Sequence, residues 1–200
     1  MRITVAGAGN VGRTLAEAWI DAGHDVTLTF SRDAEKLRET AAAIGGRAAE
    51  PAEAAVRAEA ILLAVPAAMA GDALGALAPA PGQVVIDATN DLGEGRAANG
   101  AASLAEGVPG VPVVQAFNTV FAGEMAAARD KEQPPDLLIA GDDAGAVATT
   151  EELARDAGFR PIRAGGLDVA GDVEAFARLV IGLAYREKRG PFVYRLSIPS

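Results

Sequence analysis

The chain has 200 residues, of which 50% are hydrophobic and 22% are charged, and its formal net charge at pH 7 is −9. This length is typical of one soluble globular domain, so we expect residues 1–200 to form a single unit. The negative charge argues against general binding to nucleic acid, and the lack of cysteine excludes disulfides and thiolate metal sites.

Other classes are disfavoured by single features of the sequence. One histidine in the whole chain argues against a histidine-based metal site, so we assign no metal ligands. No apolar run approaches the roughly 18 residues of a membrane span, and no charged leader precedes an apolar stretch. We therefore expect a cytoplasmic protein that binds small molecules and neither membranes nor nucleic acid.

Short apolar runs alternate with helical patterns along the chain. In chain order, they predict strands at about 2–7, 25–30, 46–49, 60–65, 83–88, 111–116, 136–140 and 159–164. The helical patterns fall at about 10–22, 33–43, 51–58, 67–77, 99–105, 120–128, 143–157 and 168–187. Apolar strands separated by helices are typical of a mainly parallel sheet with helices on both faces. The sequence therefore predicts a doubly wound α/β fold that ends in a C-terminal helix.

A glycine-rich segment follows the first predicted strand and opens the first predicted helix. Its sequence, Gly7-Ala8-Gly9-Asn10-Val11-Gly12, fits the pattern G-x-G-x-x-G. In that pattern the first glycine permits a tight turn, the second lets the backbone approach a pyrophosphate, and the third allows close packing of helix on strand. A glycine turn without a ligand is the alternative. The position between strand and helix favours a Rossmann-type dinucleotide site formed by these six residues.

The end of the second predicted strand indicates which dinucleotide is bound. An NAD site usually has an acidic residue there, about 20 residues past the glycines, to accept hydrogen bonds from a ribose hydroxyl. Here Ser31 and Arg32 occupy that place, and Asp33 is expected to cap the next helix. A hydroxyl and a guanidinium suit a 2′-phosphate, although a solvated turn would also carry them. We therefore expect NADP(H) to be the cofactor.

The last predicted helix carries a broad apolar surface. Its apolar residues are Val169, Val173, Phe176, Val180 and Leu183, widened by Leu179 and Ile181. This surface either packs on the sheet alone or also meets a second subunit, and we favour a homodimer. Glu174 and Arg178 are placed to form an ion pair four residues apart.

Three further features have modest implications. Five glycines make residues 91–110 the loosest segment, which is either a lid over the site or a weakly ordered connection. His24 lies in a turn between helix and strand, and we expect a surface turn residue there and not a catalyst. Tyr185 and Lys188 are spaced by three residues and do not match Tyr-x-x-x-Lys, so we expect them on a helix surface.

Several segments together resemble the NADPH-dependent coenzyme F420 reductase family, and the likeness covers nearly the whole chain. They are the glycine loop, Ser31-Arg32-Asp33, Ala64-Val65-Pro66, Asp87-Ala88-Thr89-Asn90, the segment from Val114 to Val120, Ala140-Gly141-Asp142-Asp143 and Gly165-Gly166-Leu167. The segment Phe117-Asn118-Thr119 is also similar to the cytosolic domains of STEAP-type metalloreductases. The resemblance therefore leaves a deazaflavin or a flavin open as the partner of NADP(H).

The resemblance implies roles for particular residues. It implies that Ser31 and Arg32 hold the 2′-phosphate and that Val65 and Pro66 lie against the nicotinamide half. The acceptor pocket is implied to run along Asn118, Thr119, Val120 and Phe121. Three positions depart from the family, namely Asn118 in place of an archaeal histidine, Ala8 in place of a frequent threonine, and Asp91 in place of a frequent proline.

Hydride transfer between two stacked rings needs positioning more than acid–base chemistry. We assign no catalytic side chain, which fits the lack of a visible triad or metal cluster in the sequence. The sequence and the resemblance together favour an NADP(H)-dependent oxidoreductase that exchanges hydride with coenzyme F420, a deazaflavin. An NADPH-dependent flavin or metal reductase, or an NADP-binding sensor without turnover, are the alternatives.

Overall fold

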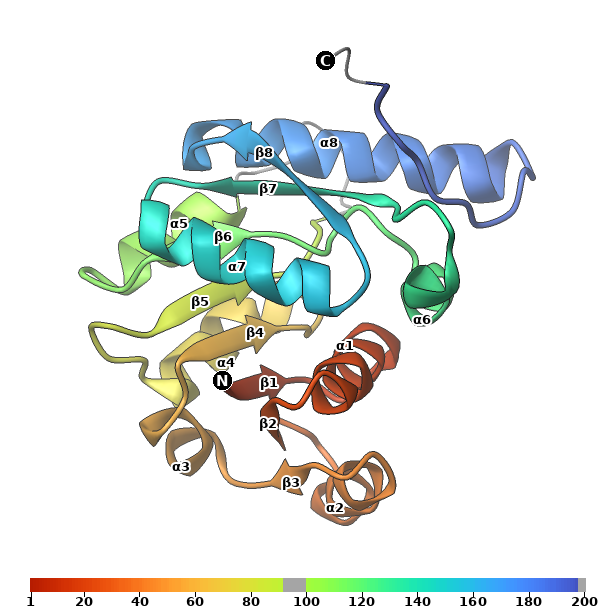
Figure 1. Ribbon diagram of the computed structural model, residues 1–200. Helices are drawn as coiled ribbons and strands as arrows, with labels where there is room; N and C mark the ends of the chain where they lie inside the picture. Colours follow the sequence, from red (N-terminus) through yellow and green to blue (C-terminus); the bar gives the residue numbers. More distant parts are fainter. Residues whose placement is uncertain (92–99, 198–200) are drawn as a thin grey trace.

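The computed structural model describes residues 1–91 and 100–197, and these residues form an eight-stranded sheet covered by helices (Figure 1). The strands are β1 (Arg2–Ala6), β2 (Asp25–Thr29), β3 (Arg47–Ala48), β4 (Ala60–Leu63), β5 (Val84–Asp87), β6 (Val113–Gln115), β7 (Asp136–Gly141) and β8 (Arg160–Gly165). Their order across the sheet is β3-β2-β1-β4-β5-β6-β7-β8. All neighbouring strands are parallel except β6 and β7, which are antiparallel. The predicted mainly parallel Rossmann-type sheet is confirmed.

Helices cover both faces of this sheet, as predicted. They are α1 (Asn10–Asp21), α2 (Ala34–Ala43), α3 (Pro51–Val56), α4 (Ala70–Leu77), α5 (Gly100–Gly107), α6 (Ala122–Ala126), α7 (Ala144–Asp156) and α8 (Ala170–Ile181). One face carries α1, α2, α6 and α7, and the other carries α3, α4, α5 and α8 (Figure 1). Short helical turns flank three of these helices, at Ala67–Met69 before α4, at Ala128–Asp130 after α6, and at Leu167–Val169 and Gly182–Arg186 on either side of α8.

The strands alternate their side chains between two hydrophobic cores. Val5 and Leu62 point into the core beneath α1 and α7, whereas Ala6 and Leu63 point into the core beneath α4 and α8. This alternation follows from the period of two in a strand, and it explains why strands buried on both faces are continuously apolar. Trp19 of α1 is fully buried, and its indole N–H donates to the Leu153 carbonyl of α7 at 2.9 Å.

The predicted elements have their counterparts in the structure, with differences at their ends. Pro66 lies at the start of the predicted helix 67–77, which opens as a 3-10 turn and becomes α4 at Ala70. The predicted helix 168–187 leaves α-helical geometry after Ile181 and continues as a π-helical turn to Arg186. Within the segment 91–110, α5 occupies Gly100–Gly107, and residues 92–99, on which the lid prediction mainly falls, lie outside the described part.

Two predictions about single side chains need correction. The expected ion pair between Glu174 and Arg178 was wrong, because Glu174 turns toward the sheet and is 2% exposed. His24 does lie in a turn, but its side chain is largely buried and contacts Asp156 of α7 at 2.8 Å. Tyr185 and Lys188 are exposed, as expected, but Lys188 lies beyond the helical segment, which ends at Arg186.

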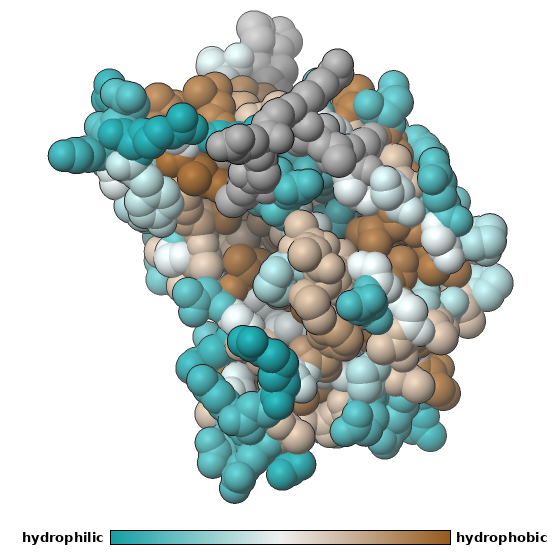
Figure 2. Space-filling view, turned by 180° about the vertical axis from the view of Figure 1, so that it is seen from behind, coloured by the Kyte–Doolittle hydropathy of each residue, from teal (hydrophilic) through white to brown (hydrophobic). Residues whose placement is uncertain are grey.

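The surface on the back of the molecule mixes hydrophilic and hydrophobic residues, with hydrophilic ones gathered at its lower end (Figure 2). Within residues 1–91 and 100–197, no helix is long and apolar enough to cross a membrane.

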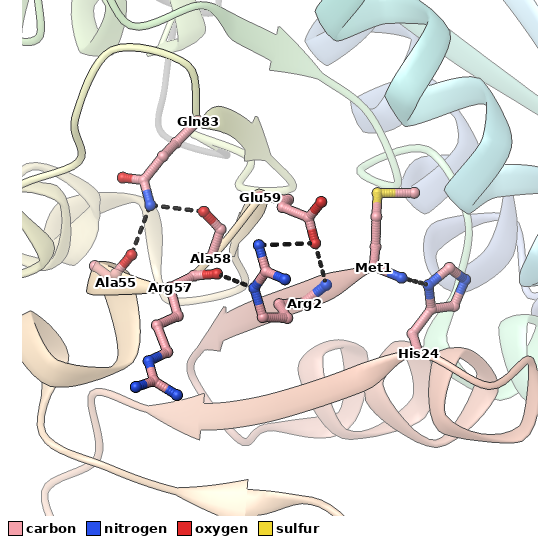
Figure 3. A network of polar contacts seen from close by, with 8 residues as sticks. All are labelled: Met1, Arg2, His24, Ala55, Arg57, Ala58, Glu59 and Gln83. Atoms are coloured by element: carbon pink, nitrogen blue, oxygen red, sulfur yellow. Dashed lines mark hydrogen bonds and ion pairs between the residues drawn. The ribbon is translucent and has the colours of Figure 1, made fainter.

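A polar network closes the edge of the sheet at which the parallel strands begin (Figure 3). The Met1 ammonium contacts His24 Nδ1 at 3.1 Å, and the Arg2 guanidinium donates to the Arg57 carbonyl at 2.7 Å. Gln83 donates from its amide nitrogen to the carbonyls of Ala55 in α3 and Ala58 in the α3–β4 connection. These contacts are structural, and they leave the opposite edge, where the parallel strands end, to form a site.

Candidate functional site

The glycine loop joins the end of β1 to the start of α1. Gly7 has φ +99°, and a Cβ at this position would lie 2.4 Å from the Ala64 carbonyl oxygen. A Cβ at Gly12 would lie 2.0 Å from the Gly7 carbonyl oxygen, so α1 begins in close contact with the loop. At Gly9, by contrast, a Cβ would meet nothing within 4 Å. Two glycines therefore close the turn, and the middle one leaves its outer side open to a ligand.

The first turn of α1 offers backbone amides to this open side. Gly9 occupies the N-cap position and has no side chain with which to cap the helix. Asn10, Val11 and Gly12 supply the first-turn N–H groups. A helix N-terminus of this kind combines hydrogen-bond donors with a partial positive charge, and both favour a phosphate.

A cavity of about 620 Å³ opens beside the loop. Its walls come from the glycine loop, the connection between β2 and α2, and the residues that follow β4. The lining residues are Gly7, Ala8, Gly9, Phe30, Ser31, Arg32, Asp33, Lys36, Leu37, Thr40, Ala64, Val65, Pro66 and Met69. The structure thus brings together three groups of predicted site residues that lie far apart in the sequence.

The cavity also includes residues that the sequence reasoning missed, chiefly Lys36 and Met69. Lys36 could have been found, because it lies in the first turn of the helix that Asp33 caps, close in sequence to Arg32. Met69 reaches the cavity only because Pro66 is followed by a short 3-10 turn, which the helical pattern did not predict.

The charge at the β2–α2 end of the cavity is positive. The Asp33 carboxylate accepts a hydrogen bond from the Lys36 N–H at 3.0 Å, which confirms the predicted cap of α2. The Asp33 carboxylate therefore interacts with the N-terminus of α2. In the described part of the chain, neither Arg32 nor Lys36 forms an ion pair, and both are exposed. The Ser31 hydroxyl donates to the Asp33 carbonyl at 3.0 Å and stays at the cavity wall.

The segment after β6 packs differently from the glycine loop. The Asn118 side-chain amide donates to Asn90 Oδ1 at 3.1 Å, which links the residues after β6 to those after β5. The Thr119 hydroxyl contacts the Tyr194 hydroxyl at 2.6 Å, and the Phe121 ring lies 5.7 Å from that of Tyr185.

This packing determines what residues 118–121 expose. Asn118, Thr119 and Val120 are buried, and Phe121 is partly buried. None of the four lines the 620 Å³ cavity. The buried Asn118 Oδ1 has no hydrogen-bond partner. Tyr194 belongs to the C-terminal tail, so this segment is covered partly by the chain itself.

Two buried carboxylates, those of Asp87 and Glu174, meet where β5 and β6 end, and the sequence did not predict that they are buried together. Asp87 and Gln115 are neighbours across the two strands, and Gln115 donates to Glu174 of α8 at 3.1 Å. Burial raises the pKa of Asp87 to about 6, against the opposing effect of hydrogen bonds from Thr89. Burial likewise raises the pKa of Glu174, although the Gly100 N–H donates to it.

Among the described residues, no group of three or more histidine, cysteine, aspartate or glutamate side chains could hold a metal ion. The open glycine loop, the free helix N-terminus and the cationic end of the cavity fit a dinucleotide with an additional phosphate.

Comparison with known proteins places the chain in a family. Residues 2–91 match the family described as "NADP oxidoreductase coenzyme F420-dependent". The chain is also 32% identical to the F420-dependent NADP reductase of Methanothermobacter thermautotrophicus, over 94% of this chain and 91% of the relative. The chain belongs to this family.

Two solved structures share this fold over most of the chain. A crystal structure from Arthrobacter sp. FB24, named as a candidate F420-dependent NADP reductase, has a TM-score of 0.85 and 25% identity. The alignment covers 99% of this chain and 100% of that one. A hypothetical protein from Sinorhizobium meliloti has a TM-score of 0.74 and 30% identity, over 86% of this chain and 88% of its own. The family resemblance seen in the sequence is therefore confirmed, and the chain is a member of a family of NADP oxidoreductases.

Proposed function

We propose that the protein transfers hydride between NADPH and coenzyme F420. The observation that carries this proposal is the cavity in which the glycine loop, Ser31, Arg32 and Lys36 meet, in a chain of the F420-dependent NADP oxidoreductase family. NADPH, when bound, supplies the hydride, and the deazaflavin ring accepts it. The protein's task is to hold the two rings in contact and to exclude water.

The proposed NADP site uses the residues around the cavity. The N–H groups of Asn10, Val11 and Gly12 hold the pyrophosphate next to Gly9, where no Cβ intervenes. Ser31, Arg32 and Lys36 hold the 2′-phosphate through one hydroxyl and two cations.

Val65 and Pro66 form the wall for the nicotinamide half. Both residues follow β4 and line the same cavity as the glycine loop. Pro66 has no N–H group, so it shapes this wall without offering a hydrogen-bond donor.

The proposed acceptor site lies along Asn118, Thr119, Val120 and Phe121. The unpaired Asn118 Oδ1 and the aromatic edge of Phe121 supply one polar and one apolar contact for a planar ring. Neither Asn118 nor Thr119 is a strong acid or base, so we assign them to orientation. Thr119 fulfils this role through its hydrogen bond to Tyr194, which fixes the C-terminal tail against the segment.

The test is anaerobic turnover of NADPH with a panel of oxidised acceptors that contains coenzyme F420, FMN and FAD. We expect kcat/KM to be higher for coenzyme F420 than for FMN or FAD. The loss of the deazaflavin absorbance measures the reduction of coenzyme F420. Reduction of flavins alone would contradict it and would favour a flavin or metal reductase. Tight NADPH binding without turnover of any acceptor would favour a sensor.

We also propose that the protein is a homodimer that associates through α8. Val173 and Val180 are buried within the chain, so they are not available to a partner. Leu179 of α8 is 57% exposed, and Tyr185 in the turn that follows α8 is 63% exposed. Exposed large apolar side chains on one segment favour an interface.

A further inference from the structure

A cleft at the C-terminal end of α8 has no role in the function proposed so far. It has a volume of about 480 Å³ and lies where α8 passes into its π-helical turn. Its lining residues are Arg178, Leu179, Gly182, Leu183, Arg186, Glu187 and Arg189. In Figure 2, hydrophilic side chains project at the upper left, at the end of the molecule where Figure 1 places the end of α8.

The charges that line this cleft are unbalanced. Three arginines face one carboxylate, Glu187, in a protein whose net charge is −9. In the part of the chain that the structure describes, none of the three arginines forms an ion pair. The Nη1 atom of Arg178 is buried and has no hydrogen-bond partner. A buried guanidinium N–H without an acceptor is costly, so this group is available to an acceptor that the described residues do not supply.

The local backbone geometry brings two of these arginines together. Arg178 and Arg186 lie four residues to either side of Gly182, so all three share one side of the helix. A Cβ at Gly182 would lie 3.3 Å from Arg186 Nη2, so the glycine leaves room for that guanidinium above the turn. Two guanidinium groups on one side of a cleft suit the planar recognition of phosphate or carboxylate.

The cleft is linked to the proposed acceptor site through Tyr185, the chain neighbour of the lining residue Arg186. The Tyr185 ring meets the Phe121 ring at 5.7 Å, edge to face, and Phe121 ends the proposed acceptor segment. On α8, Glu174 lies one turn before Arg178 and accepts from Gln115 at the end of β6. Successive turns of α8 therefore carry one residue at the ends of the strands, Glu174, and one residue in the cleft, Arg178.

We propose that this cleft binds an anionic group, a phosphate or carboxylate, that the hydride acceptor carries at a distance from its ring. The inference rests on the proposed function and defines the acceptor more closely. Coenzyme F420 has a phosphodiester and glutamate carboxylates beyond its ribityl chain, and FMN has one phosphate. The same rings without these groups, the deazaflavin headgroup that ends in a ribityl hydroxyl and riboflavin, are matched probes.

The test measures binding without turnover. Oxidised coenzyme F420 and its phosphate-free headgroup are titrated into the wild-type protein and into Arg178→Gln and Arg186→Gln, in the absence of NADPH. Arg38→Gln, on α2 and away from the cleft, is the control. We expect the Kd of coenzyme F420 to rise about tenfold in each cleft variant, with no change for the headgroup or the control. The salt dependence of coenzyme F420 binding should weaken in parallel.

The outcomes separate this inference from the proposed function. Arg186 is exposed, so Arg186→Gln keeps the test valid even where Arg178→Gln reduces stability. Equal affinity of the wild-type protein for both probes, or equal losses for both in the variants, would overturn the cleft assignment. A change of molecular mass in either variant would also overturn it, because the arginines would then contact a second subunit. Tail-dependent binding without reduction by NADPH would contradict the proposed function and leave the cleft assignment standing.

Discussion

Arg32 and Lys36 give the cavity its positive end, and Asp33 between them is committed to capping α2. This arrangement could be read from the sequence in part, because the missing acid at the end of the second strand is a local feature. The predicted cap at Asp33 places Lys36 in the first turn of α2, so this residue too could have been included from the sequence.

The Arg32→Ala variant tests this end of the site. A hydrogen bond to a charged group contributes roughly 1.5–3 kcal/mol, so we expect NADPH affinity to fall about 10- to 150-fold. NADH has no 2′-phosphate, so the affinity of the variant for NADH should change little. Calorimetric titration of both cofactors measures the difference, with Arg38→Ala on the exposed side of α2 as control. Equal losses for NADPH and NADH would refute the assignment.

Asp87 illustrates a residue whose properties the sequence could not provide. Its place at the end of an apolar strand is visible, but its burial depends on Glu174, 87 residues later, and on how α8 covers the ends of β5 and β6. A carboxyl in this position is shielded from water, and a second carboxyl lies close by. Its proton is therefore held more tightly in the folded than in the unfolded state.

Replacement of Asp87 by asparagine should change how stability depends on pH. The folded-state pKa of about 6 exceeds the usual 3.8, so protonated Asp87 favours folding at low pH, and this contribution is lost as pH rises through 6. Asp87→Asn should therefore raise the free energy of unfolding by about 1–3 kcal/mol near pH 7.5 and much less near pH 4.5. Urea unfolding at both pH values measures this change in the free energy of unfolding. Asp72→Asn on the surface is the control. A less stable variant at pH 7.5 would contradict the account.

At the scale of elements, different glycines of the loop serve helix packing and ligand binding. Gly12 is close to the Gly7 carbonyl, whereas Gly9 has open space before it. The motif predicted these roles because its spacing is tied to a strand, a turn and a helix. The end of α8 was less predictable, since an apolar pattern continues through Leu183 while the backbone changes to a π-helical turn after Ile181.

Two alanine substitutions distinguish the roles of the glycines. Gly12→Ala forces a Cβ against backbone and should lower the free energy of unfolding by about 1–3 kcal/mol. Gly9→Ala should fold normally but weaken NADPH binding by about tenfold or more, because its methyl occupies the pyrophosphate position. Thermal unfolding and NADPH titration check both variants, with Gly75→Ala in α4 as a control that leaves binding unchanged. Normal NADPH affinity in Gly9→Ala would place the pyrophosphate elsewhere.

At the scale of the whole molecule, the alternation of apolar strands and helices was sufficient to predict the parallel sheet. It could not reveal that β7 runs antiparallel to β6, because an apolar strand has the same composition in either direction. Nor could it reveal that the tail returns to the sheet edge. There the Leu196 N–H donates to the buried Asp136, which also pairs with Arg160 of β8. Contacts between residues so far apart in the chain depend on the completed fold.

The proposed dimer is tested by the mass of the intact protein in solution. The exposed apolar side chains of the last helical segment should be partly covered by a second copy. Light scattering at tens of micromolar should therefore give twice the chain mass of 20.2 kDa. A single species of 20.2 kDa would refute the dimer.

The central claim is that hydride passes directly from NADPH to a deazaflavin held in the same site. It is tested most directly with NADPH deuterated separately on each face of nicotinamide C4, mixed anaerobically with oxidised coenzyme F420. Mass spectrometry of the reduced deazaflavin should detect deuterium from one labelled face and none from the other, because the fixed geometry presents a single face to the acceptor. Reduced deazaflavin without deuterium from either face, or a lack of reduction despite tight NADPH binding, would contradict the account.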